Sequence, residues 1–183
     1  AAAEHDVDGL CVQGADAGGH RGTLDEAKDP STDDLIDLVK AVRAAVDLPI
    51  VAAGGVSLPQ RAAQLRAAGA DAIQVGTLLL LTPEAGTHLV HRRALGDPAF
   101  TETTVTRVFS GRLARSLVND FVRAHDGHAP AVYPEVNHVA GPLRRAAAAA
   151  EDPQWFALWA GTGWRDARPV PAAVVVRDLA ASL

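Results

Sequence analysis

Three short apolar runs mark the first part of the chain, at residues 9–13, 49–53 and 71–75. None of them alternates apolar and polar positions, which is typical of parallel strands covered on both faces. Apolar residues at helical spacing follow the capping residues 31–33, and a second helical pattern spans about 58–68. Because strands and helices alternate, the pattern predicts βαβ units and a parallel sheet, which is an α/β fold.

Each predicted strand is followed at once by glycine. Gly14 follows the first, Gly54-Gly55 the second and Gly76-Thr77 the third. A single glycine after a strand is more often an ordinary turn residue. Three in succession indicate that the carboxyl edge of the sheet is held open for a ligand.

The last two of these loops have the spacing of a phosphate site. Barrels of eight βα units bind phosphate with the loops after strands 7 and 8, where glycine leaves backbone N–H groups free to bind an anion. The alternative is a glycine-rich rim without a ligand. On this numbering the three strands are strands 6 to 8, and about five units, roughly 150 residues, are expected before Ala1. The absence of methionine and a helix-like segment at residues 1–5 agree with that expectation.

The expected fold is therefore the C-terminal portion of a TIM (β/α)8 barrel with a helical insertion. Residues 1–82 would hold the last βα units, 83–152 the insertion, and 153–183 a closing segment with the final barrel helix. Helices are predicted at about 83–95, 111–125 and 143–151 and from about residue 171, and no strand is expected within the insertion.

The segment 13–22 is the best candidate for chemistry. It follows the first strand, four of its ten residues are glycine, and it contains His20. Glycine lets the backbone approach a ligand closely, and histidine exchanges a proton near neutral pH. A purely structural histidine is the alternative.

Five motifs together resemble the nitronate monooxygenase family, formerly called 2-nitropropane dioxygenases, whose members are FMN enzymes on a TIM barrel. The resemblance covers nearly the whole chain, and its first three motifs are specific at their spacings. The motifs are residues 13–22, 49–55 and 69–77, Phe-Ser-Gly-Arg at 109–112, and Leu-Trp-Ala-Gly at 158–161.

The resemblance implies oxidation of nitronates or nitroalkanes with molecular oxygen. FMN would be the electron sink, which amino-acid side chains cannot provide. His20 matches the catalytic histidine, which acts as the base or otherwise activates the substrate. Asp16 and Thr162 stand where the family more often has glutamate and glutamine, which leaves the substrate range open. The cofactor contacts expected are Gln13, Gly18, Gly54, Gly55, Gln74, Val75, Gly76 and Thr77, with the last four at the phosphate end.

Two other functions fit the same motifs. A flavin-dependent enoyl-acyl-carrier-protein reductase II shares the barrel, the flavin and the Gly-Gly-His loop, but uses NAD(P)H. A flavin- or phosphate-binding protein without turnover is the third interpretation.

The composition limits the kinds of partner and the compartment that are expected. A hydrophobic content of 48% and a net charge of −5 indicate a globular protein without a nucleic-acid partner. No apolar stretch approaches the roughly 20 residues of a membrane span, and no signal peptide is visible. The single cysteine, Cys11, lies in an apolar run and is expected to be a buried thiol, which fits a reducing, cytoplasmic compartment. A homodimer is one possible assembly.

The remaining histidines and arginines favour structural roles. His88 and His91 lie three apart on a predicted helix, but no acidic or cysteine partner is nearby, so no metal site is expected. Arg112 and Arg115 are expected on one solvated or salt-bridged helix face, with an anion clamp as the alternative. The three tryptophans are expected to pack the closing segment onto the barrel rather than to line a substrate site. Surface roles are expected for His125 and His128, and a structural role for His138, with a place at the border of the active site as its alternative.

Overall fold

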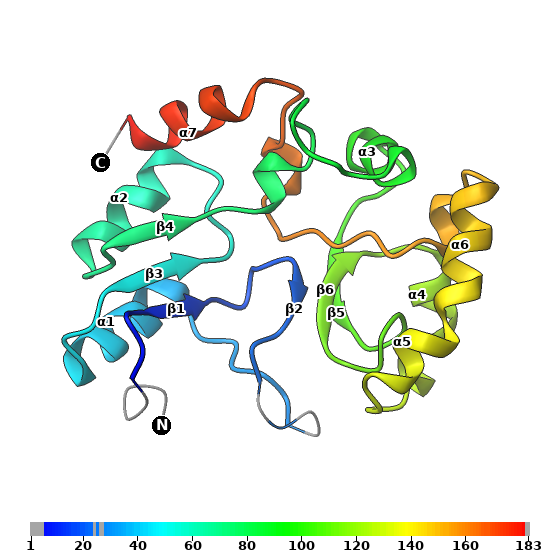
Figure 1. The fold of residues 1–183 in the computed structure, drawn as a ribbon, viewed down its shortest axis with the longest axis horizontal. Coiled ribbons are helices and arrows are strands. Elements are labelled where there is room, and N and C mark those ends of the chain that lie inside the picture. The colour runs from blue at the N-terminus through cyan, green and yellow to red at the C-terminus, as the bar shows by residue number, and fades with distance from the viewer. Residues whose placement is uncertain (1–5, 24, 26–27, 182–183) are drawn as a thin grey trace.

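The computed structural model describes residues 6–23, 25 and 28–181, and its first part is a three-stranded parallel sheet (Figure 1). The strand order is β1 (Leu10–Gln13), β3 (Ile50–Ala53) and β4 (Ala72–Gln74). In register, Cys11 lies opposite Val51, and Val51 lies opposite Ala72. The three predicted strands and their parallel arrangement are therefore confirmed. The helical ending expected at residues 1–5 lies outside the described residues.

Two helices cover one face of this sheet. They are α1 (Leu35–Ala45) and α2 (Pro59–Ala67), and both match the predicted segments. The carboxylate of Asp34, one residue after the predicted cap, accepts a hydrogen bond of 2.8 Å from Ile36 N and begins α1. The core between helices and sheet consists of Leu35, Val39, Ile50, Ala52, Val56, Ala62, Leu65 and Ala70.

The expectation that both faces of the strands are covered is wrong for the described part of the chain. Cys11, Ala72 and Gln74 lie on the face opposite the helices, and all three are exposed. The prediction of a buried thiol at Cys11 is therefore also wrong. An apolar run predicts that a strand forms, but the elements that cover each face are set by tertiary packing. In the described ranges, the sheet is not closed into a barrel.

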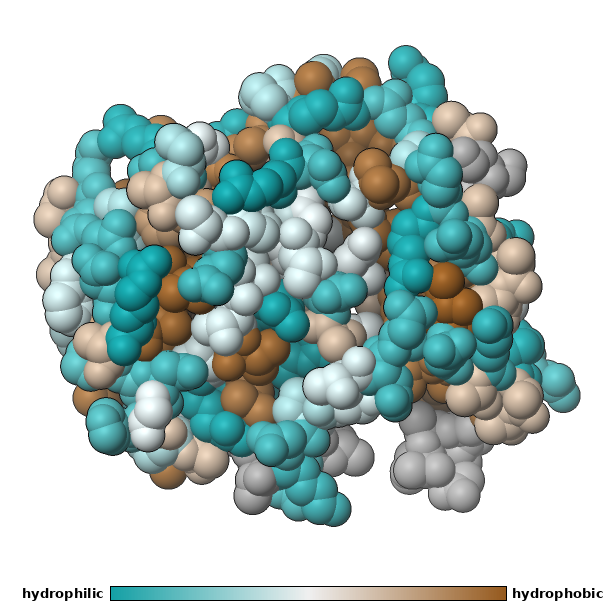
Figure 2. Space-filling view, turned by 180° about the vertical axis from the view of Figure 1, so that it is seen from behind, coloured by the Kyte–Doolittle hydropathy of each residue, from teal (hydrophilic) through white to brown (hydrophobic). Residues whose placement is uncertain are grey.

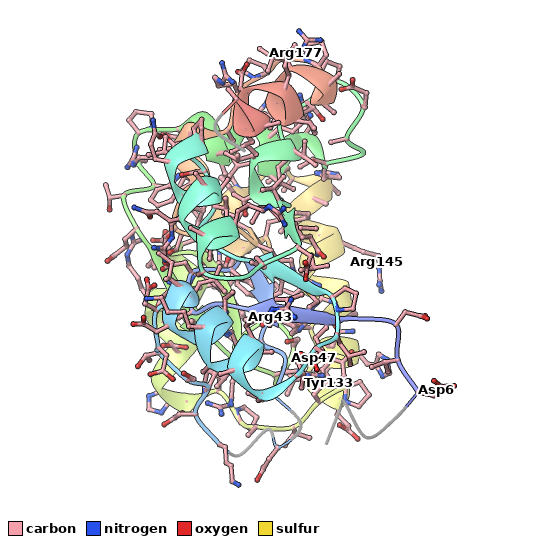
Figure 3. The ribbon with its side chains drawn as sticks, turned by 90° about the vertical axis from the view of Figure 1, so that its left-hand side faces the viewer. Asp6, Arg43, Asp47, Tyr133, Arg145 and Arg177 are labelled. Atoms are coloured by element: carbon pink, nitrogen blue, oxygen red, sulfur yellow. The ribbon has the colours of Figure 1, made fainter. Side chains whose placement is uncertain are left out.

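One half-buried arginine near the end of α1 joins this helix to the sheet. Arg43, labelled in Figure 3, donates from Nε to Gly69 O and from Nη1 to Leu48 O, both at 3.1 Å. Its Nη2 lies 2.5 Å from the carboxylate of Asp71. A hydrogen bond from Ile50 N, reinforced by Arg43, holds the pKa of Asp71 below its usual value. Strand and helix ends are thus joined through backbone carbonyls.

A second, antiparallel sheet corrects the predicted all-helical insertion. Its order is β2 (Gly19–His20), β6 (Ala114–Leu117) and β5 (Thr103–Thr106). The predicted helix at 111–125 is wrong in its first half, because β6 occupies it and α4 (Asp120–His125) begins only after the Asn119 cap. Three of the four β5 residues are threonine and the fourth is valine, and such β-branched side chains favour a strand.

The other helices follow the predictions more closely. The helix expected at 83–95 begins later, as α3 (Leu89–Gly96), because the ring of His88 caps it by accepting from Val90 N. The helices expected at 143–151 and after residue 171 are confirmed as α6 (Gly141–Ala149) and α7 (Ala172–Ala180). Short elements that were not predicted are α5 (Glu135–Val139), η2 (Thr77–Leu79), η3 (Asp126–His128), η4 (Pro153–Trp155) and η5 (Trp164–Asp166).

The closing segment joins the two sheets. Leu117 N donates to Leu158 O at 2.9 Å, and Ala160 N donates to Arg115 O at 3.3 Å, so this segment runs along β6. It then reaches the end of β4, as Figure 1 shows. The second core consists of Ala94, Leu95, Phe100, Leu117, Leu158, Ala160 and Trp164.

The surface has no continuous apolar belt on the side seen in Figure 2. Apolar side chains form separate areas among polar ones there, and residues of intermediate hydropathy fill the middle. Among the described residues, no helix combines the length and apolar character that crossing a membrane requires.

A pair of leucine variants tests the packing of α2. Leu65 is fully buried under the sheet, whereas Leu58 at the start of the same helix is 53% exposed. We expect Leu65→Ala to lower the free energy of unfolding by about 3 kcal/mol, because it removes buried methyl groups and leaves a cavity. Leu58→Ala should change it by less than about 0.5 kcal/mol. Denaturant unfolding of the natural full-length protein measures both, and equal losses would contradict this helix orientation.

Candidate active site

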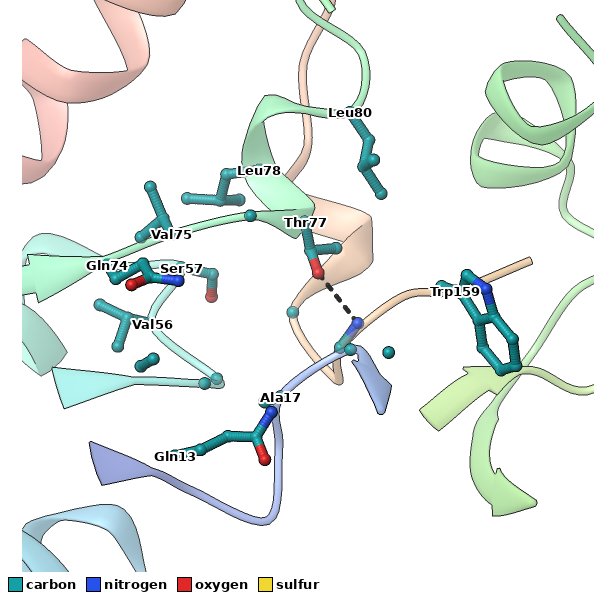
Figure 4. A pocket seen from close by; sticks show the side chains of 18 residues that line it. Gln13, Ala17, Val56, Ser57, Gln74, Val75, Thr77, Leu78, Leu80 and Trp159 are labelled. Atoms are coloured by element: carbon teal, nitrogen blue, oxygen red, sulfur yellow. Dashed lines mark hydrogen bonds between the residues drawn. The ribbon is translucent and has the colours of Figure 1, made fainter. Parts of the chain in front are cut away.

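A pocket of about 280 Å³ opens where β1, β3 and β4 end (Figure 4). The loops after these strands and the closing segment form its walls. Parallel strands bring their carboxyl ends to one edge of a sheet, which is why residues far apart in sequence meet there. All the cofactor residues predicted from the sequence line it: Gln13, Gly18, Gly54, Gly55, Gln74, Val75, Gly76 and Thr77.

Several lining residues escaped the sequence predictions. Ser57 and Leu78 are examples, and neither lies in a motif that the pattern singled out. Trp159 was expected only to pack, yet it forms part of the wall. Gly161 ends the Leu-Trp-Ala-Gly motif and Gly163 follows it, but the pattern did not show that this segment reaches a pocket built by the first half of the chain.

Direct contact between backbones shapes the pocket. A Cβ atom on Gly18 would lie 2.6 Å from Gly161 N, and a Cβ on Gly161 would lie 2.6 Å from Asp16 O. Gly55 has φ +67°, and its Cβ would meet the side chain of Asp16 at 2.6 Å. Only glycine fits at such approaches, so the glycines let the three loops lie directly against one another.

Thr77 connects the pocket floor to the closing segment. Its hydroxyl accepts a hydrogen bond of 3.0 Å from Gly161 N, drawn as a dashed line in Figure 4. Because that bond uses a lone pair, the hydroxyl proton can be donated to another group. Thr162 N donates to Asp16 O at 3.1 Å beside it. At Gly76 a Cβ would meet no protein atom within 4 Å, so the backbone there borders open space.

Two arginines, Arg21, which is buried, and Arg115, which is half-buried, hold the loop after β1 from the side of the second sheet. Arg115 on β6 donates from Nε and Nη2 to Ala15 O at 3.1 and 3.0 Å, and Arg21 donates to the same carbonyl at 3.3 Å. Burial lowers the pKa of both guanidinium groups, while the Asp16 carboxylate opposes this shift. The carbonyl of Ala15 therefore accepts hydrogen bonds from two cationic side chains, and the carboxylate of Asp16 lies near both as a counter-charge.

The predicted placement of Arg112 and Arg115 on one helix face is wrong. Arg115 lies on a strand, and Arg112 lies in the loop before it. The Nη2 atom of Arg112 donates to the carbonyls of Arg21 and Thr23, at 3.1 and 2.8 Å. A helical spacing of three was mistaken for a shared face because the strand character of β6 was not recognised.

His20 lies beside the pocket, and the Trp159 ring lies between it and the pocket. Its Nε2 lies 2.8 Å from the Oγ of Ser110, and its ring lies 5.5 Å from that of Trp159 and 5.8 Å from that of Tyr133. The amide of Gln13 fixes the backbone here, since Nε2 donates to His20 O and Oε1 accepts from Gly22 N, both at 2.9 Å. His20 itself is exposed and does not line the pocket, but the Trp159 ring that touches it does.

His88 and His91 have packing roles. His91 is buried, which lowers its pKa to about 4 against the effect of a hydrogen bond with the Trp159 backbone. His88 stacks on Phe156 with ring centres 5.2 Å apart. Within the described residues, no group of three or more histidine, cysteine or acidic side chains has the arrangement of a metal site.

Comparison with known proteins identifies the family. The family model for nitronate monooxygenase matches residues 1–182. The chain belongs to the nitronate monooxygenase family. It is 36% identical to the nitronate monooxygenase of Pseudomonas aeruginosa over 97% of this chain and 51% of the relative, and 32% identical to a probable nitronate monooxygenase of Staphylococcus saprophyticus over 94% and 50%. This chain spans about half the length of these curated relatives.

Two solved structures are similar to this chain. A nitroalkane oxidase from Streptomyces ansochromogenes superposes with a TM-score of 0.88 at 52% identity, over 96% of this chain and 51% of that one. FabK from Thermotoga maritima superposes with a TM-score of 0.76, over 97% of this chain and 55% of that one. At 23% identity, this second likeness concerns the fold alone.

Substituting the glycine at the loop contact tests the architecture of the site. We expect Gly161→Ala to destabilise the protein by about 1–3 kcal/mol, because the new Cβ collides with Asp16 O and the backbone must shift. Gly86→Ala is the matched control, since a Cβ at Gly86 meets nothing within 4 Å. Thermal unfolding of both variants measures the difference, and equal stability would show that the two loops are not in contact.

Proposed function

We propose that this protein binds FMN in the pocket and oxidises nitronates or nitroalkanes with molecular oxygen. One observation carries the proposal: eight residues expected to contact the cofactor, from the ends of three strands and the loops after them, line one pocket beside His20. Family membership supports the same conclusion. We further propose that β1, β3 and β4 are strands 6 to 8 of a (β/α)8 barrel, and that residues 83–152 are an insertion between the barrel units and the closing segment.

The residues present fit a flavin phosphate. Gly54, Gly55 and Gly76 line the pocket, the backbone at Gly76 borders open space, and Thr77 keeps a hydroxyl proton to donate. Backbone N–H groups freed by glycine, together with a hydroxyl, are suitable donors to a phosphate. The pocket volume lies near the lower end of the roughly 300–1,000 Å³ of small-molecule sites. Gln13 and Gly18 would contact the flavin on the side nearest His20.

The chemistry divides between the cofactor and the protein. Bound FMN supplies the electron sink that the oxidation needs. His20 takes a proton from the carbon that bears the nitro group, and the electron pair of that C–H bond stays on the substrate, which becomes a nitronate. Trp159 forms an apolar wall between the histidine and the pocket, and the interlocked glycine loops hold the site in one shape before substrate arrives.

Removing the histidine tests this assignment. We expect His20→Ala in the natural full-length protein to retain FMN but to turn over nitroalkanes about 10²–10⁴-fold more slowly, because general base catalysis supplies a factor of that size. A preformed nitronate such as propionate 3-nitronate needs no deprotonation, so its oxygen uptake should fall much less. Oxygen consumption with both substrates measures the difference.

Other outcomes would identify a different function. Wild-type nitroalkane rates in His20→Ala would remove this histidine from the mechanism. Rapid anaerobic bleaching of the flavin by NADPH, with an enoyl thioester as the acceptor and no oxygen uptake with nitronates, would favour the enoyl reductase. A flavin spectrum that stays unchanged with every nitronate would indicate binding without turnover.

A valine at Gly76 tests the phosphate position. A Cβ atom there would meet no protein atom within 4 Å, so the side chain would extend into the space proposed for the phosphate. We expect Gly76→Val to raise the dissociation constant of FMN about tenfold or more, which corresponds to roughly 1.4 kcal/mol. Fluorescence titration of the apoprotein with FMN measures it. Gly86→Val, another substitution into open space, should leave the constant unchanged, and an equal constant for Gly76→Val would reject this site.

A further inference from the structure

A pocket lined by three arginines lies apart from the candidate active site. Its volume is about 570 Å³, which is within the roughly 300–1,000 Å³ of small-molecule sites. Residues of α3, of η5 and of the segments after η2 and η5 form it, and it shares no lining residue with the pocket at the strand ends. We call it the arginine pocket, after Arg92, Arg93 and Arg165.

The lining of the arginine pocket is positive, although the whole chain carries a net charge of −5. Among the described residues, none that lines it is acidic. The two acidic residues next to the lining in sequence have other contacts. Asp97 Oδ1 accepts a hydrogen bond of 2.8 Å from Ala99 N. Asp166 Oδ2 would lie 3.8 Å from a Cβ atom at Gly163, which belongs to the other pocket.

Arg92 keeps its charge without a carboxylate. Its Nη1 donates to Leu80 O and Thr82 O, at 3.1 and 3.0 Å, and its Nη2 donates to Leu81 O at 2.5 Å. These bonds use at most three of the five N–H groups of a guanidinium, so at least two have no partner in the described part of the chain. The three carbonyls hold the group in place but do not neutralise it.

Arg165 is held in a similar way. Its Nη2 donates to Phe100 O at 3.0 Å, and its Cζ lies 4.7 Å from the ring centre of the buried Trp164. An aromatic ring attracts a cation without cancelling its charge. Within the described ranges, Arg165 has no ion pair either, whereas Arg93 is paired with Glu151. Two of the three cations in the pocket therefore lack a counter-charge.

The other lining residues indicate what a ligand would contain besides its charge. Leu81, Leu95, Ala167 and Pro169 are apolar, and Leu95 is only 6% exposed. A ligand that fits both parts has an anionic group and an apolar body. Two cations match the charge of a phosphate monoester, which is close to −2 near pH 7. The planar fork of arginine also binds phosphate oxygens in pairs.

We propose that the arginine pocket binds a small phosphate monoester with an apolar or aromatic body. The phosphate would contact Arg92 and Arg165, and the body would pack on Leu95 and Pro169. Because both guanidinium groups are already fixed by backbone carbonyls, little conformational entropy is lost when the anion binds. This site is separate from the one proposed for the flavin phosphate.

Calorimetric titration of the natural full-length protein tests the ligand class. The protein is loaded with FMN and freed of unbound FMN, so that the first pocket is occupied. AMP is the probe, adenosine lacks its phosphate, and inorganic phosphate lacks its body. We expect AMP to bind with a dissociation constant below about 1 mM, and adenosine and inorganic phosphate to bind at least about tenfold more weakly.

A matched pair of arginine variants tests the location. We expect Arg165→Gln to raise the dissociation constant of AMP about tenfold or more, because it removes one of the two uncompensated charges. Arg177→Gln makes the same change at an exposed arginine of α7 that lies outside the pocket and is labelled in Figure 3. It should alter that constant by less than about twofold.

Three results would overturn the proposal. The first is no heat of binding with AMP up to about 10 mM. The second is adenosine or inorganic phosphate binding as tightly as AMP, and neither of these results needs a variant that folds. The third is an equal effect of Arg165→Gln and Arg177→Gln, which indicates only general attraction of anions. If the protein binds no FMN, the proposed function fails, but the comparison of the two variants still decides whether this pocket binds the probe.

Discussion

The approach of the loop after β1 to the closing segment is the constraint on which the rest of the structure depends. Gly18 and Gly161 touch through their backbones, and Thr162 N donates to Asp16 O. These contacts join the parallel sheet to the antiparallel one at the carboxyl ends of the strands. A side chain at either glycine would force the two halves apart, and the pocket between them would lose a wall.

Charged side chains from the second sheet strengthen this contact between the two sheets. Arg115 extends from β6 to the carbonyl of Ala15, and Arg21 meets it there. Burial makes both cations costly, and a carbonyl shared by two guanidinium groups beside one carboxylate offsets that cost with charge-assisted hydrogen bonds. Strand β6 also follows shortly after Ser110 in the sequence. The same part of the chain therefore positions both the pocket loop and the serine hydroxyl that contacts His20.

The first sheet and its two helices could be predicted because their periodicities are strong and local. Strand β6 could not, since Gly111 to Leu117 contains helix-forming residues and only pairing across the sheet makes it extended. Strand β5 does carry a local signal in its β-branched residues, which the prediction of an all-helical insertion overlooked. The pocket residues in the first three loops could be predicted because glycines follow the strands there. Trp159 and Gly161 reach the same pocket only because the chain returns to it much later in the sequence, which no local pattern encodes. Ser110 was visible as part of a motif, but its contact with His20 joins residues 90 positions apart in sequence.

That distance in sequence has a consequence for the order in which the molecule folds. Thr77 and Gly161 are separated by 84 residues, and Arg115 and Ala15 by 100. Contacts of such long range form late, because the entropy of closing a large loop must be overcome before they stabilise the chain. The βαβ units can therefore assemble first, and the pocket takes shape only in the last stage of folding, when the closing segment docks between the two sheets.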